Sequence, residues 1–275
     1  MKTIYLSLAA AMAVTLVSCS DAVTPFENPT QQNMQFKTGA SYTSRTTITN
    51  PEDSTSTTTD RHWTLVNPST TLYGRSNVAV WIDSVFSLGG AFTVADSIIL
   101  QQLPGNNDVY RYAQLIPELT VPSTFGIDLS QGWKQEAKLN AATSNWFVAE
   151  IADTIPAAAL GIPAVGVTGV KIAITDNARA AGTETLTIGS KSYVTTKTVH
   201  TIEVSASALT ALLPPVKIVG ESLIRTTWTS AELGAIIKEE REGKVIQGTI
   251  QGQNYKLFPI PGYSSAVTAI ISAGN

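Results

Sequence analysis

The clearest fold signal in the chain is the stretch Gly182-Thr183-Glu184-Thr185-Leu186-Thr187-Ile188, in which polar and apolar side chains alternate. Gly189-Ser190 then marks a turn, and Ser192 to Val204 alternates again. Alternation with a period of two, interrupted by a glycine turn, predicts two antiparallel strands of one hairpin. One face of such a sheet packs on a core and the other meets solvent, so a mainly β fold is expected.

Similar strand signals lie on both sides of this hairpin. Short turns separate most of them, which favours antiparallel neighbours over parallel crossovers. Trp133 to Leu139 fits either a strand or a helical turn, and Pro117 to Gly132 is expected to be a loop. The other predicted strands are Ser41–Thr49, Thr57–Val66, Asn77–Val85, Asp96–Leu103, Val109–Leu115, Asn145–Ile151, Val216–Thr229, Ala235–Glu242 and Val245–Leu257.

One short helix is also expected. Leu209, Leu212 and Leu213 have helical spacing, which predicts a helix over Ser205–Leu213 that ends at Pro214-Pro215. The fold prediction is therefore a mainly β protein, with a curved antiparallel sheet or half barrel and one or two short helices. The alternative is a β-sandwich, which periodicity alone does not separate from it.

The start of the chain has the pattern of a secretory leader. Lys2 supplies a positive charge, and Ile4 to Leu16 form an apolar run too short to span a bilayer permanently. The run closes with Leu16-Val17-Ser18-Cys19, which resembles the lipobox of bacterial lipoproteins. That resemblance implies cleavage before Cys19 and lipidation of its thiol. It also accounts for a single cysteine in 275 residues, which cannot form an intrachain disulfide.

The predicted secretion and lipidation determine the expected organisation of the chain. Residues 1–18 are the signal peptide, and residues 19–38 are a polar, turn-forming tether. Residues 39–275 form a β-rich envelope domain, with two sub-lobes, 39–150 and 165–275, as one option. The expected partner is the membrane, through acyl chains on Cys19, and the outer membrane is the expected location.

A second resemblance covers about residues 182–245. The carriers of the pattern are Gly182, Gly189 and Tyr193, followed by Trp228, Gly234 and Lys238-x-Glu240. This arrangement resembles β-rich bacterial envelope proteins of unknown function. Those proteins are similar in outline to the half-closed barrels of lipoprotein carriers, in which a curved sheet wraps over a helix.

Composition excludes several functions. The net charge is -3 and charged residues make up only 14% of the chain, so no basic surface for nucleic acid is indicated. His62 and His200 are the only histidines and belong to no metal-binding motif, so each is expected on a strand face. Glu239 to Glu242 is expected to be a solvated edge. No catalytic residues, metal site or cofactor are predicted, and the protein is not expected to be an enzyme.

The stretch Ile155 to Val170 carries no charge before Lys171 and is the candidate ligand region. Ile155, Leu160, Ile162, Val165 and Val167 are its candidate lining residues, although a loop and strand packed into the core is the favoured explanation of the stretch. Three functions stay open. These are a non-catalytic binding or carrier module for an apolar ligand, a structural or protein-interaction lipoprotein, and a hydrolase built around a histidine.

Overall fold

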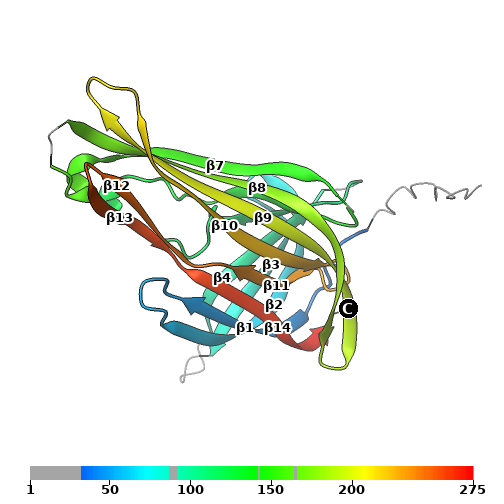
Figure 1. Ribbon diagram of the computed structural model, residues 1–275. Coiled ribbons are helices and arrows are strands. Elements are labelled where there is room, and N and C mark those ends of the chain that lie inside the picture. The colour runs from blue at the N-terminus through cyan, green and yellow to red at the C-terminus, as the bar shows by residue number, and fades with distance from the viewer. Residues whose placement is uncertain (1–31, 87–91, 104, 142, 164–165, 275) are drawn as a thin grey trace, which may run out of the picture. The chain divides into compact units, whose positions relative to one another are not determined.

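The structure of the protein is a computed structural model that describes residues 32–274, apart from 87–91, 104, 142 and 164–165. The leader, Cys19 and the tether up to residue 31 lie outside the described residues. Twelve strands form one antiparallel sheet in the order β6-β5-β4-β3-β2-β1-β14-β11-β10-β9-β8-β7 (Figure 1). The predicted mainly β fold is confirmed, and one continuous sheet takes the place of the two sheets of a sandwich.

The N-terminal half of the sheet is a meander in which each strand pairs with the next. The last strand of this meander, β6, forms one edge of the sheet. The strands are β1 (Ala40–Thr49), β2 (Ser56–Leu72), β3 (Arg75–Phe86), β4 (Phe92–Gln102), β5 (Asp108–Ala113) and β6 (Gly132–Lys138).

The C-terminal half continues the sheet from the other side of β1. Strand β14 pairs with both β1 and β11, so it joins the two halves. The strands are β7 (Asn145–Pro156), β8 (Val167–Ile188), β9 (Lys191–Thr210), β10 (Val216–Ser230), β11 (Ala235–Arg241) and β14 (Gly262–Ala273). A separate hairpin consists of β12 (Lys244–Ile250) and β13 (Gln253–Ile260).

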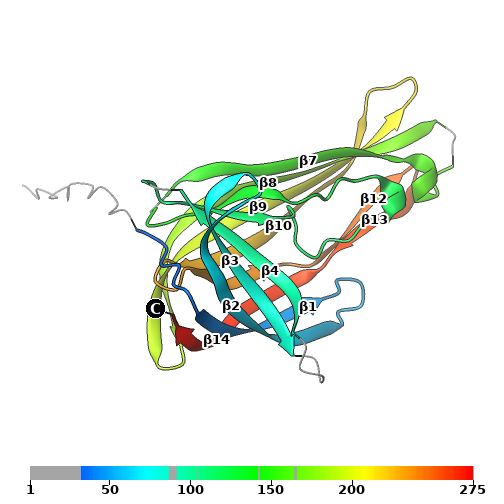
Figure 2. The same ribbon diagram turned by 180° about the vertical axis from the view of Figure 1, so that it is seen from behind.

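The sheet curls so that its two edge strands approach each other. The indole Nε1 of Trp146 on β7 donates a hydrogen bond of 2.9 Å to the backbone oxygen of Gln135 on β6. The sheet is thereby nearly closed, and Figure 2 shows β3 and β4 crossing in front of the long strands β8 to β10. This geometry agrees with the predicted half barrel.

The helix predicted over Ser205–Leu213 is wrong. Ser205 to Thr210 continue β9, with Ala206 and Ala208 buried and Ser205 and Ser207 half-buried. Strands β8 and β10 pair with this segment on both sides and satisfy its backbone, which outweighs the helical spacing of the leucines. The helices in the described residues are two short 3₁₀ turns, η1 (Ser123–Phe125) and η2 (Ala157–Leu160).

The single strand predicted over Val245–Leu257 is a hairpin. Gln251 and Gly252 form its two-residue turn, both with positive φ, at 52° and 77°. Two consecutive left-handed residues make a type I′ turn, whose twist matches that of the flanking strands. The turn thus folds β13 back on β12, and this hairpin packs near β10, where Gly248 lies close to Val219.

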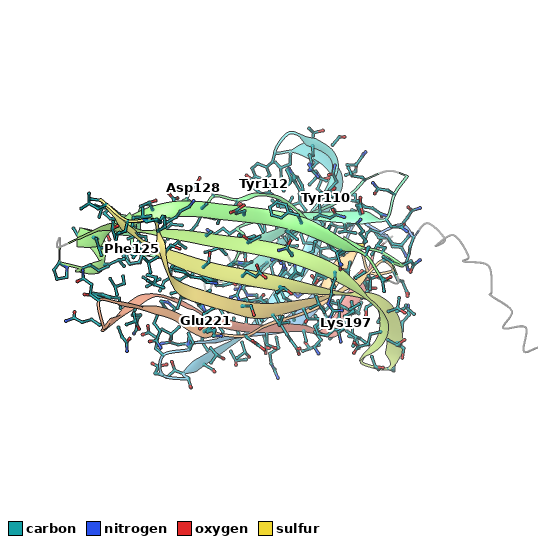
Figure 3. The ribbon with its side chains drawn as sticks, turned by 45° about the horizontal axis from the view of Figure 1, so that its top comes forward. Tyr110, Tyr112, Phe125, Asp128, Lys197 and Glu221 are labelled. Carbon is teal, nitrogen blue, oxygen red and sulfur yellow. The ribbon has the colours of Figure 1, made fainter. Side chains whose placement is uncertain are left out.

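Two large hydrophobic clusters fill the concave side of the sheet. The first centres on β8, β9 and β10 and is closed by β12, β13 and the segment around Phe125. The second contains Trp81, Leu100 and Tyr193 and lies mainly on β1 to β6. Figure 3 places Phe125 and Lys197 toward opposite ends of the long strands. Both clusters take residues from both halves of the chain, so they do not follow the predicted sub-lobes.

The described part of the expected tether packs on the domain. Met34 is buried, its backbone nitrogen donates to Oε1 of Gln102, and that of Gln35 donates to the oxygen of Ala231. The folded part of the chain therefore begins before residue 39. No helix among the described residues is long and apolar enough to cross a membrane.

Candidate functional site

Two features of the interior could support function, a buried charged layer and an apolar groove. The charged layer lies between the two hydrophobic clusters. Its side chains come from strands that also contribute residues to these clusters. On β9, for example, His200 lies between Ile202 of the first cluster and Tyr193 of the second. The layer comprises Arg111, Glu136, Asp176, His200, Arg225, Glu239 and Arg241.

Arg225 is the centre of this layer. Its Nε lies 2.8 Å from Oε1 of Glu239, and its Nη2 lies 2.7 Å from Oε1 of Glu136. Arg111 approaches the second oxygen of Glu239 at 3.0 Å. His200 places Nδ1 3.1 Å from Asp176 and Nε2 3.7 Å from Glu136. The Arg225 and Arg111 guanidiniums are therefore paired with the Glu136 and Glu239 carboxylates, as burial of charge in a low-dielectric interior demands.

The carboxyl of Glu239 is strongly perturbed by these neighbours. Burial acts to raise its pKa, but the Arg225 and Arg111 guanidiniums outweigh burial and hold the pKa well below its usual range. The pKa of Glu136 is lowered in the same way, with burial opposed by Arg225 and His200. Both groups stay ionised at neutral pH.

The charged layer corrects one sequence prediction, the solvated edge at residues 239–242, while both histidines lie on strands as expected. Glu239 and Arg241 are buried rather than part of a solvated edge, because alternate residues of β11 face the interior while Glu240 between them faces solvent. His200 is fully buried, whereas His62 is half-buried on β2. In the part of the chain that the structure describes, no group of His, Cys, Asp and Glu is arranged to hold a metal.

The space next to the charged layer is small. One cavity of about 30 Å³ lies between Tyr42, Arg111 and Tyr263, and another of about 10 Å³ lies between Lys134, Asp176 and Arg225. Cavities of this size hold a water molecule or two and no organic ligand. The layer is thus closed to substrates.

The apolar groove lies at one end of the long strands and has a volume of about 560 Å³. It is bounded by the start of β8, the β9–β10 loop and the β12–β13 turn. Val167, Ala208 and Ile250 belong to the buried first cluster and form its floor. The rim and walls are Gly166, Thr210, Ala211, Leu212, Leu213, Val216, Ile218, Thr249 and Gln251.

The chemistry of the groove is uniform. Among the described residues that line it, none is charged, and Thr210, Thr249 and Gln251 supply its polar side chains. Its volume falls within the range of small-molecule sites, which run from about 300 to 1,000 Å³ and are mostly apolar. The groove is open to solvent, because Leu212, Leu213 and Val216 on its rim are exposed to 94%, 66% and 53%. This arrangement suits a neutral apolar ligand.

The residues predicted to line a ligand site do not lie together at one site in the structure. Val167 lines the groove, and Ile155 and Ile162 are buried in the first hydrophobic cluster. Leu160 is partly buried against the same cluster, while Val165 lies outside the described residues. Whether any of these residues contacts a ligand stays a prediction.

Sequence reasoning missed most of the groove. The segment from Ser205 to Val216 carries no charge, and this signal was available beside the helical spacing of its leucines. Gln251-Gly252 offered a second signal, since glycine preceded by a polar residue is typical of a hairpin turn. Together these segments supply both walls of the groove.

The aromatic residues of β2 and β5 are engaged with partners inside the protein. Trp63 is buried and its Nε1 donates to Oγ of Ser44. Tyr112 stacks on Tyr73 with ring centroids 3.9 Å apart, and Tyr110 lies against the Arg75 guanidinium at 4.4 Å. The contacts of Tyr112 and Tyr110 hold the β2–β3 turn against β5.

Comparisons with known proteins give two structural likenesses. The chain is similar to a candidate lipoprotein from Parabacteroides distasonis, with a TM-score of 0.43, 11% identity and coverage of 87% of this chain and 98% of that one. It is also similar to a candidate exported protein with a YmcC-like fold from Bacteroides fragilis, with a TM-score of 0.34, 10% identity and coverage of 88% and 100%. At these TM-scores neither likeness carries a conclusion about this chain. No protein-family model and no curated protein sequence matches it.

Proposed function

We propose that this protein is a lipid-anchored bacterial envelope protein that binds a neutral apolar ligand, without catalysis, in the groove between β8, the β9–β10 loop and the β12–β13 turn. The observation that carries the proposal is the uncharged lining of this groove over a floor of core residues. An acyl chain is the ligand class that fits it best, since it needs apolar surface and few hydrogen bonds.

The energetic argument for binding rests on the exposed rim. Burial of apolar surface contributes roughly 25 cal/mol per Å², or about 0.8 kcal/mol per methylene. Leu212, Leu213 and Val216 are exposed without a ligand, and an apolar chain in the groove would cover them. The floor is already packed, so the ligand needs no opening of the core.

The lipid anchor is proposed on sequence grounds. Leu16-Val17-Ser18-Cys19 follows an apolar leader, and Cys19 is the only cysteine of the chain. Attachment of two or more acyl chains there would hold the domain at a membrane. The outer membrane is our proposed location, and the protein needs no cofactor for this role.

The absence of catalysis is proposed from the position of His200. Its ring is fully buried, with Nδ1 on Asp176 and Nε2 facing Glu136. A general base must come within hydrogen-bond reach of a substrate proton. His200 would need an opening of the sheet to do so, and none of the described residues that line the apolar groove is titratable.

The test is native mass spectrometry of the soluble chain from Ser20 on, produced in a periplasm and followed by mass spectrometry of its organic extract. We expect one apolar molecule per chain. The variant Ala211→Trp places a large side chain on the groove rim and should reduce the bound fraction at least tenfold.

The matched control is Ala269→Trp, because Ala269 is also exposed but lies on β14 outside the groove. It should retain the ligand fully. A stable wild-type chain that is empty after mild purification would contradict the proposal, as would equal retention by both variants.

An interaction lipoprotein without a small ligand is the second candidate. A cleft of about 350 Å³ lies between the edge strand β7, at Ala149 to Asp153, and residues Asp128 to Lys134 before and on β6. Edge strands present unpaired backbone groups that can accept a strand of another protein. An empty groove together with specific cross-linking of a partner to β7 would favour this candidate.

A further inference from the structure

The β9–β10 loop is an apolar projection at the groove end of the molecule. It consists of Ala211-Leu212-Leu213-Pro214-Pro215, all exposed, followed by exposed Val216 (Figure 1, upper left). We propose that this loop inserts into a lipid bilayer and brings the mouth of the groove to the hydrocarbon. The inference deepens the proposed function, on which it rests, by naming a lipid surface as the partner of the same site.

The backbone of the loop suits insertion. Hydrocarbon offers no hydrogen bonds, so each unpaired backbone N–H or C=O that enters it is strongly unfavourable. Pro214 and Pro215 carry no N–H. The backbone nitrogen of Leu213 donates to Oγ1 of Thr210 at 2.9 Å, and this hydroxyl donates to the oxygen of Leu213 at 3.0 Å. The apolar tip therefore carries few unpaired donors.

The charge pattern also favours a bilayer. No charged residue occurs from Ser205 to Val216, and Lys217 comes immediately after. Lys217 is exposed at the base of the loop. A lysine at this depth can keep its ammonium group among anionic headgroups while the leucines enter the acyl region.

The size of the tip argues against a protein partner as its occupant. A stable protein interface buries roughly 800 Å² on each side. Here the exposed apolar surface is confined to one narrow loop, whose leucines also form the rim of the groove. Insertion would cover the exposed leucines and, in the same step, give an acyl chain a continuous apolar path to Val167 and Ala208.

The described part of the tether, residues 32–38, lies far from the loop. β10 begins at Val216 beside the groove and ends at Ser230, and Ala231 then accepts the hydrogen bond from Gln35. A strand of 15 residues spans roughly 45 Å. Residues 32–35 thus pack at the end of β10 that is far from the loop.

The test uses the unlipidated chain from Ser20 on, which contains both hydrophobic clusters and lacks Cys19. Without Cys19 the chain has no cysteine, so Leu212→Cys provides a single site for an environment-sensitive NBD label. Vesicles of phosphatidylethanolamine and phosphatidylglycerol (3:1) should raise the NBD emission several-fold and shift it to the blue. Bromine on the acyl chains should quench it.

The matched control is Val194→Cys with the same label. Val194 is 54% exposed and lies near the start of β9, at the end of the strand far from the loop. Its emission should not change with vesicles. In co-sedimentation, Leu212→Asp should weaken vesicle binding at least tenfold, and Val194→Asp should leave it unchanged.

Two results would overturn the inference. One is an unresponsive label at position 212, and the other is equal vesicle binding by Leu212→Asp and the wild type. Native mass spectrometry of the same samples separates this failure from that of the proposed function. A silent label on a chain that carries an apolar ligand would refute insertion alone, whereas a responsive label on a chain that never binds a ligand would support insertion and refute the proposed function.

Discussion

The charged layer and the apolar groove are opposite solutions within one sheet. In the layer, strands β5, β6, β10 and β11 bury arginines and glutamates as ion pairs, and β8 and β9 place Asp176 against the ring of His200. At the groove, the β9–β10 loop and the start of β10 carry apolar residues that the protein leaves exposed. The first region resembles a functional site in composition but is closed, while the second lacks reactive groups but is open.

The two regions therefore differ in whether a ligand can reach them from solvent. The buried charged layer is a structural network, whereas the open groove is a candidate binding site. Loss of one partner of a buried ion pair strongly destabilises the fold, because the other charge remains unpaired in a low-dielectric environment. Exposed leucines cost the fold little when they are replaced, because few contacts depend on them. Mutations in the charged layer should therefore lower the stability of the fold, and mutations at the groove should weaken ligand binding.

The largest effect is expected for Arg225→Met. It leaves Glu136 and Glu239 buried without their main counter-charge. We expect the free energy of unfolding, measured in urea, to fall by about 3–5 kcal/mol. Lys191→Gln, which breaks the exposed pair with Glu232, is the control and should not measurably change it. A change below about 1 kcal/mol in Arg225→Met would contradict a structural role of the layer.

Acid should destabilise the protein through the same layer. The folded-state pKa values of Glu239 and Glu136 lie below those of the unfolded chain, so the unfolded state binds more protons as the pH falls below about 5. Unfolding free energy should drop by up to about 1.4 kcal/mol per pH unit for each carboxyl. Glu118, whose pKa burial raises, acts in the opposite sense. Urea midpoints at pH 7, 5, 4 and 3 measure the effect, and a flat profile would count against it.

A substitution in the β12–β13 turn should have an intermediate effect on the free energy of unfolding. Gly252 has a φ of 77°, and a Cβ placed there would meet no neighbouring atom within 4 Å. Gly252→Ala therefore tests backbone strain alone and should cost about 1–2 kcal/mol. Gly132→Ala is the control, since that residue lacks a positive φ and its nearest neighbour is the flexible end of Lys134. Equal stability of both variants, measured by thermal and urea unfolding, would show that the turn is unstrained.

The smallest effect on stability is expected at the groove rim. Leu212 is 94% exposed, so Leu212→Ser should change the unfolding free energy by less than about 0.5 kcal/mol. Binding of an apolar ligand should nevertheless weaken. A substantial loss of stability would mean that the loop packs in solution, and would remove the contrast between the two regions.

The sequence predicts the strands well because alternation is a local signal. The hairpin of β8 and β9 follows directly from Gly182 to Val204, and the turn at Gly189-Ser190 lies where expected. The ends of the strands are less predictable. β9 continues to Thr210 because two neighbouring strands pair with it, and leucine spacing alone does not report such neighbours.

The functional regions were harder to predict for a physical reason. Glu136, Asp176 and Arg225 are separated by 40 residues or more and meet only when the sheet curls. The groove joins the β9–β10 loop to a turn at Gln251 in a separate hairpin. Of the predicted ligand residues, Val167 lies on the groove, whereas Ile155 and Ile162 lie in the core beneath it. Non-local contacts of this kind leave no periodic trace in the chain.

The most direct test of the central claim is photo-cross-linking with a diazirine-bearing fatty acid, followed by peptide mapping. If the groove binds apolar ligands, label should concentrate on residues 208–218 and 249–251, and Ala211→Trp should abolish it while Ala269→Trp does not. Label spread evenly over exposed apolar residues such as Phe147 and Ile271, or label insensitive to Ala211→Trp, would contradict a ligand site in the groove.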